Sequence, residues 1–224
     1  MGNLISVAIE ATKIKEENIV DNFIGNINTE FCKLEKIHKK SGYGCLLKTR
    51  FAELDEIRNS EELKCILDQM IHAGFKAHDA KNNYMEISCQ LNDISASAMK
   101  KVDIFVSKQK GFCQKFARKE KVFRFDFNER LFDEYAKEND MNSPLKWDNI
   151  HNIVAFSFFR STLKFETIMA SAEYSISLFN YIKSNNISYE QLFDHFNSTF
   201  DKYIDFACEN YPFFKNYFKE KFKK

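Results

Sequence analysis

The sequence predicts an all-α protein, a bundle of about seven to nine helices around one central hydrophobic helix. Three observations favour this fold class. The 224 residues include only 6 Gly and 2 Pro, whereas turn-dense β architectures need many of both. The 24 Phe residues supply bulky side chains that can pack between helices. Residues 149–159 carry no formal charge, as expected for a helix that is buried on all sides.

Apolar residues in the first half of the chain recur at helical spacing. Residues 5–35 predict one helical stretch and residues 45–57 predict a second. Ser60, followed by Glu61 and Glu62, matches an N-cap with an acidic first turn. The helix that begins there is expected to carry one apolar side, formed by Leu63, Ile66, Leu67, Met70 and Ile71.

The second half contains the predicted centre of the bundle. Residues 100–130 leave two interpretations open, because charged residues alternate with single aromatics over 121–127. This period of two fits either a short strand or an irregular connection that packs its Phe side chains against the bundle. Residues 149–159 predict the central helix, and the whole of 1–224 forms one predicted domain. Amphipathic helices are then predicted over 165–182, from Ser188 and from Ser198.

Composition excludes several classes of function. Lys plus Arg (33) nearly balances Asp plus Glu (32), so the basic excess expected of a nucleic-acid-binding domain is missing. The 6 Cys residues are widely spaced without a C-x-x-C pair, which favours reduced thiols in a cytoplasmic protein over a zinc site. The five His form no ligand set, and no phosphate-binding or nucleophile motif is present. The sequence therefore predicts no enzyme, no cofactor and no metal.

A membrane-associated alternative rests on the two ends of the chain. Met1 to Ser6 matches the myristoylation pattern, with Gly2 as the candidate lipidation site. Residues 211–222 are aromatic but interrupted by lysines, which predicts an amphipathic helix rather than an anchor. The alternative function is therefore a helical peripheral membrane protein anchored by N-myristoylation. A small-molecule-binding or catalytic helical domain is a third hypothesis.

Five short segments follow one another in a recognisable order. Residues 18–24, 70–74 and 86–91 precede the uncharged segment, and residues 187–193 follow it. Within the uncharged segment, residues 153–156 are followed by Phe159. In this order the segments resemble the fourth, third, first and second homology motifs of the Bcl-2 family of apoptosis regulators, with 86–91 similar to the stretch after the third motif. The resemblance is strongest over 18–200.

The resemblance implies a regulator of apoptosis, of the pro-survival kind. Such a protein binds the amphipathic Bcl-2 homology 3 helix of a pro-apoptotic partner in a hydrophobic surface groove. It would act in the cytoplasm, at the mitochondrial outer membrane or on another intracellular membrane. The implied groove residues are Phe127, Leu131, Phe132, Asn152, Ala155 and Phe159.

Two further features belong to this resemblance. Met70, Ala73 and Gly74 would form the chain's own homology 3-like motif. Asn152 stands where the family has an Arg that pairs with an Asp of the bound helix, unless a shifted alignment uses Trp147. Since this change removes a charge-assisted contact, it shifts the expected recognition toward apolar anchoring.

Overall fold

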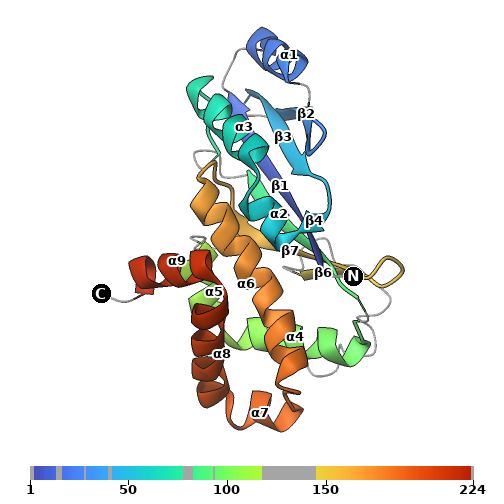
Figure 1. The fold of residues 1–224 in the computed structure, drawn as a ribbon, viewed down its shortest axis with the longest axis vertical. Coiled ribbons are helices and arrows are strands. Elements are labelled where there is room, and N and C mark those ends of the chain that lie inside the picture. The colour runs from blue at the N-terminus through green and yellow to red at the C-terminus, as the bar shows by residue number, and fades with distance from the viewer. Residues whose placement is uncertain are drawn as a thin grey trace.

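The structure is a computed structural model and describes residues 3–13, 17–27, 29–39, 42–77, 83–92, 94–117 and 145–222. It shows a mixed α/β fold with a seven-stranded antiparallel sheet, so the predicted all-α bundle is wrong. Helices pack against the sheet and also gather in a separate group at one end of the molecule (Figure 1).

The strands pair in the order β2-β3-β1-β5-β7-β6, and the short β4 pairs with β1. Their bounds are β1 (Leu4–Lys13), β2 (Cys32–Lys39), β3 (Gly42–Thr49), β4 (Ala52–Glu53), β5 (Tyr84–Gln90), β6 (Leu145–Asp148) and β7 (Ile153–Arg160).

Helices lie in three of the connections between the described strands, and further helices follow β7. Their bounds are α1 (Glu17–Asn26), α2 (Leu54–Arg58), α3 (Glu61–His72), α4 (Ala96–Lys108), α5 (Lys110–Ala117), α6 (Phe165–Ser184), α7 (Tyr189–Phe193), α8 (Phe196–Asn210) and α9 (Pro212–Phe222). Helix α6 contacts β1 and β5 and also contacts α4, α8 and α9. It therefore joins the sheet to the group of helices at the other end (Figure 1).

The core under the sheet is aliphatic. Along β1, Ile5, Val7, Ile9 and Ala11 alternate with more polar residues, and all four are buried. Because successive side chains of a strand point to opposite faces, these four lie on one face. The antiparallel register places Leu47 of β3 beside Ile9 on the same face. Buried residues of α3 and α6 belong to the same cluster and complete this core.

The core of the helical group is aromatic. Tyr174 of α6 and Phe116 of α5 pack against Phe214 of α9, with ring centroids 6.3 and 5.6 Å from the Phe214 ring. Phe222 stacks on Phe112 at 4.7 Å. The C-terminal aromatic segment is an amphipathic helix, as predicted, and its rings are used for packing.

The most consequential error of the prediction concerns the uncharged segment, residues 149–159. Residues 149–152 form the turn of the β6–β7 hairpin, and residues 153–160 form β7 rather than a central helix. Val154 and Phe156 are buried on one face of this strand, and Ala155 is nearly buried on the other. A strand that is covered on both faces has a continuous apolar sequence, which periodicity alone does not distinguish from a buried helix.

The scarcity of Gly and Pro misled the prediction because half of the six connections between the described strands contain helices, which need few turn residues. A tight hairpin joins β2 to β3, where Gly42 has φ 128°, and another joins β6 to β7. In the second hairpin the positive φ of 55° belongs to Asn152, since Asn tolerates this conformation better than most residues do. A sheet built in this way needs few of the usual turn residues.

The other predicted elements divide into errors and confirmations. Residues 5–35 contain most of β1, all of α1 and the first half of β2, and residues 45–57 contain the end of β3, β4 and most of α2, so neither is one helix. Ser60 is the N-cap of α3 and accepts the Leu63 N–H, as predicted. The α3 residues expected to be buried are buried except Ile71, which is 49% exposed. The helices predicted over 165–182 and from Ser188 are confirmed as α6 and α7.

Candidate functional site

The groove that the resemblance implied is not formed by the described residues. Phe127, Leu131 and Phe132 lie outside them, as does Gly2. Asn152 lies in a hairpin turn, and Ala155 and Phe159 lie on β7. Phe159 is only 1% exposed and packs its ring against Phe116 and Tyr174. Its position in the core leaves no surface for a visiting helix.

The residues of the homology 3-like motif end a helix. Gly74 has φ 82° directly after α3, and its N–H donates to Ile71 O while the Phe75 N–H donates to Met70 O. This pair of bonds is the usual left-handed stop of an α-helix, which favours Gly. Met70 is buried in the core, and the Lys13 ammonium donates to the Ala73 carbonyl oxygen. These contacts give Met70, Ala73 and Gly74 a structural role.

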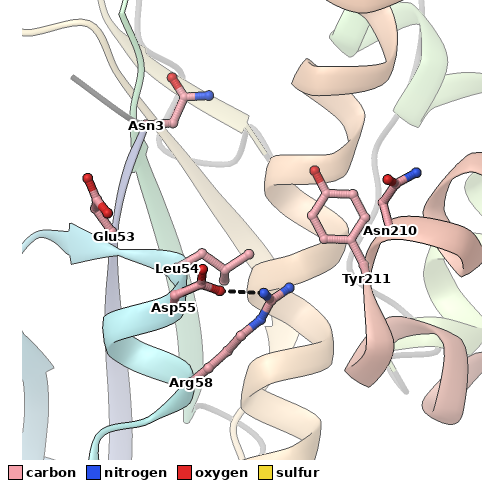
Figure 2. A pocket seen from close by; sticks show the side chains of 7 residues that line it. All are labelled: Asn3, Glu53, Leu54, Asp55, Arg58, Asn210 and Tyr211. Atoms are coloured by element: carbon pink, nitrogen blue, oxygen red, sulfur yellow. Dashed lines mark hydrogen bonds and ion pairs between the residues drawn. The ribbon is translucent and has the colours of Figure 1, made fainter.

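Two hollows adjoin α2 and share the side chain of Asp55. The first, which we call the Arg58 hollow, has a volume of about 390 Å³ and is shown in Figure 2. Its lining consists of Asn3, Glu53, Leu54, Asp55, Arg58, Asn210 and Tyr211. The second, which we call the Arg50 hollow, has a volume of about 620 Å³. Its lining consists of Glu30, Phe31, Arg50, Asp55, Glu56, Asn59, Ser60, Glu61 and Glu62.

The Arg58 guanidinium is fixed in position by a buried carboxylate. Its Nε and Nη2 atoms lie 3.0 and 2.9 Å from Oε1 of Glu173, a residue of α6 that is 0% exposed. The other oxygen of Glu173 accepts the Phe214 N–H at 2.7 Å, in the first turn of α9. Burial raises the pKa of Glu173, while the Phe214 N–H and Arg58 act in the opposite direction. One carboxylate thus ties α2, α6 and α9 together.

The remaining edge of the Arg58 guanidinium faces the hollow. Its Nη1 atom donates to Oδ1 of Asp55 at 2.6 Å, as the dashed line in Figure 2 marks. The Asp55 side chain is 78% exposed, whereas that of Arg58 is 20% exposed. The Glu53 carboxylate lies apart from the guanidinium (Figure 2) and has no ion-pair partner among the described residues.

A chain of hydrogen bonds fixes the opposite wall of the Arg58 hollow. The Asn92 N–H donates to Oδ1 of Asn3, whose amide donates to Oδ1 of Asn180 at 3.3 Å. The Asn180 amide in turn donates to the Tyr211 hydroxyl at 2.7 Å. Burial raises the pKa of Tyr211, so its hydroxyl is protonated at neutral pH. Within the described part of the chain no acceptor takes that proton, which leaves a donor at the hollow.

The Arg50 hollow is lined mainly by carboxylates. Oε1 of Glu62 accepts the Phe31 N–H at 3.1 Å and also the Thr29 hydroxyl, so this side chain is fixed. Arg50 pairs with Glu56 and lies 5.3 Å from the centre of the Phe31 ring. Glu30 is exposed and has no ion-pair partner in the described ranges.

Together the two hollows form an acidic surface. Six carboxylates line them, against two guanidiniums that each already pair with a carboxylate. The sequence contained a signal for this surface, since five of the ten residues 53–62 are acidic. The prediction used only Glu61 and Glu62, and only as the start of a helix.

The described residues hold an exposed His–Asp pair, but neither a metal-binding cluster nor a membrane-spanning helix. Among them, no group of three or more His, Cys, Asp and Glu is placed to hold a metal ion. No helix in the described ranges is long and apolar enough to cross a bilayer. His151 Nδ1 lies 2.7 Å from Asp148, but Asp148 also accepts the Ile150 and His151 N–H groups. This exposed pair therefore stabilises the β6–β7 turn.

Comparisons with known proteins assign no family to this chain. No protein-family model matches the chain, and no curated protein matches its sequence. The resemblance to the Bcl-2 family therefore stays a prediction.

Proposed function

We propose that this protein is a non-catalytic binding protein that takes a Lys- and Arg-bearing segment of a partner protein along the two hollows beside α2. The observation that carries the proposal is the excess of carboxylates, six against two guanidiniums, in two adjoining hollows. Such a field attracts a basic segment and repels an acidic one.

The state of the individual charges supports this choice of ligand. Glu30 and Glu53 lack ion-pair partners among the described residues, so a ligand cation can pair with them without breaking an existing bond. Arg50 and Arg58 are already paired with acidic side chains and therefore repel a basic ligand less than free cations would. Exposed pairs of this kind contribute little each, and affinity requires several of them acting together.

The size of the surface favours an extended segment over a single small cation. The hollows have volumes of about 390 and 620 Å³ and meet at Asp55. A chain with basic side chains at intervals can occupy both at once, whereas a small amine fills one. Partner binding through a protein segment also retains the general mode that the sequence predicted, with charged contacts in place of an apolar groove.

The two earlier hypotheses draw less support from the structure. The apoptosis-regulator function depended on a central helix, and its residues form a turn and a buried strand. The peripheral membrane hypothesis used the aromatic C-terminal helix, whose Phe214 and Tyr217 are buried against α5 and α6. An acidic surface is also repelled by anionic lipids.

Titration calorimetry with the peptide acetyl-Trp-Gly-Lys-Arg-Lys-Arg tests the proposal. We expect binding that weakens steeply as salt is added, because exposed ion pairs are screened. The triple variant Glu30→Gln, Glu53→Gln, Asp55→Asn should bind about tenfold more weakly.

A matched control removes the same charge elsewhere. Glu190, Asp201 and Asp205 are exposed on α7 and α8, and the variant Glu190→Gln, Asp201→Asn, Asp205→Asn should keep the affinity of the unmodified protein. Equal losses in the two triple variants would show that net charge alone matters and would contradict the proposed site. Spermidine binding as tightly as the peptide would contradict the choice of an extended segment.

A further inference from the structure

The geometry points to a chain end in the Arg58 hollow: we propose that Arg58 binds the C-terminal carboxylate of the basic segment. This inference rests on the proposed function and adds which part of the ligand each hollow takes. The Arg50 hollow, which is the more acidic, receives basic side chains, and the Arg58 hollow receives the free carboxylate that ends the segment.

The first argument is that the Arg58 guanidinium is positioned before any ligand arrives. Glu173 engages its Nε and Nη2 atoms from within the protein, so this edge does not reorient when a ligand binds. The Nη1 edge remains directed at the hollow. A guanidinium that is fixed in this way binds a carboxylate with little further loss of conformational entropy.

The second argument is that Asp55 already occupies the position of a ligand carboxylate. Its Oδ1 lies 2.6 Å from Nη1, a normal length for a charge-assisted hydrogen bond. The side chain is 78% exposed and three residues from Arg58 on α2, so it can rotate into solvent. An exposed pair of this kind contributes little to stability, so a better-placed ligand carboxylate can replace it.

The exchange also balances charge. When the ligand carboxylate takes Nη1, the Asp55 carboxylate is released, and Asp55 also lines the Arg50 hollow. There it can pair with a basic side chain of the same ligand. Neither a new unpaired cation nor a new unpaired anion is created, and the Arg58 hollow keeps its net charge.

The third argument is the neutral hydroxyl donor of Tyr211, which lines the same hollow as Arg58. The Tyr211 hydroxyl accepts from Asn180 and keeps its own proton for a further acceptor. A carboxylate has a second oxygen that needs such a donor when the first binds a guanidinium. Leu54 adds an aliphatic contact beside these polar groups.

The test compares two peptides that differ only at the chain end. Acetyl-Trp-Gly-Lys-Arg-Lys-Arg is used once with a free carboxylate and once as the C-terminal amide, both against the full chain. We expect the acid to bind at least about tenfold more tightly, as one charge-assisted hydrogen bond at a partly buried site provides. Long-range attraction alone predicts the opposite order of affinities, because the amide carries more net positive charge.

Two variants make the assignment specific to Arg58. Asp55→Asn removes the competing carboxylate, so the ratio of acid to amide affinity should rise, even where both affinities fall. Arg58→Met combined with Glu173→Gln removes the guanidinium without leaving a buried charge, and this ratio should fall below one.

The failures of the two proposals are distinguishable. Amide and acid binding equally, or the amide binding more tightly, overturns the C-terminal assignment and leaves the basic-segment proposal standing. Failure of both peptides to bind overturns the proposed function together with this inference. A ratio above ten that survives in the Arg58→Met, Glu173→Gln protein places the carboxylate elsewhere and also overturns it.

Discussion

The two hollows beside α2 share Asp55 but anchor their guanidiniums differently. Arg58 is bonded to a carboxylate that is 0% exposed, in the part of the molecule where the sheet meets the C-terminal helices. Arg50 lies at the surface, paired with exposed Glu56 and resting on the Phe31 ring. The difference separates two uses of the same residue type. Arg58 belongs to the fold as well as to the site, whereas Arg50 belongs to the surface.

The largest expected effect is on stability, and it tests whether the two arginines are anchored differently. If both substitutions lower stability equally, the comparison fails. Arg58→Ala leaves Glu173 buried without its cation, so the free energy of unfolding should fall by about 3 to 5 kcal/mol. Arg50→Ala removes an exposed pair and should cost no more than about 1 kcal/mol. Urea denaturation followed by circular dichroism measures both. Recovery of most of the loss in the Arg58→Met, Glu173→Gln double variant would show that the buried charge is the cause.

A smaller effect concerns pH. Burial raises the pKa of Glu173 above its ordinary value of 4.5, so the unfolded chain loses this proton first as pH rises. Glu173 therefore makes stability fall as pH rises above about 4.5, until the carboxyl is ionised in the folded state as well. Relative to Glu173→Gln, the unmodified protein should lose unfolding free energy as pH rises from about 4.5. Parallel pH profiles of the two proteins would contradict the raised pKa.

The smallest effect concerns the local structure at the Arg50 hollow. Ser60 lines that hollow and its hydroxyl accepts the Leu63 N–H at 3.1 Å, capping α3. Ser60→Ala should lower the free energy of unfolding by about 1 kcal/mol, the usual contribution of such a cap. Ser95, which caps α4 through the Ala98 N–H, provides the matched control away from both hollows. If peptide affinity falls for Ser60→Ala but not for Ser95→Ala, the cap helps to shape the Arg50 hollow.

Local signals predicted several elements of the fold correctly. Ser60 and Ser188 marked true helix starts, because their side chains cap the first turn and the signal lies within four residues. The alternation of the large apolar residues Ile5, Val7 and Ile9 with smaller or polar residues was an equally local strand signal, and the prediction overlooked it. For residues 153–160 the local pattern was ambiguous, since a strand buried on both faces carries no alternation.

The candidate site was beyond prediction from a single sequence for a different reason. Arg58 and Glu173 are 115 positions apart, and nothing near either residue indicates that they meet. The acidic run over 53–62 was visible, but only the fold places Asn3 and Tyr211 beside it. A surface assembled from distant segments requires the topology first.

Because Glu173 bonds both to Arg58 and to the Phe214 N–H, it affects the order in which the protein folds. This carboxylate joins a residue 115 positions before it to one 41 positions after it, so its full set of bonds forms only when α9 has docked. Contacts between such distant segments form late, because the intervening loops must be ordered first. During synthesis from the N-terminus, a nascent chain that still lacks Phe214 presents α2 and Arg58 before Glu173 has its second partner. On the proposed function, recognition of a partner's chain end therefore requires that α9 has been synthesised and has docked.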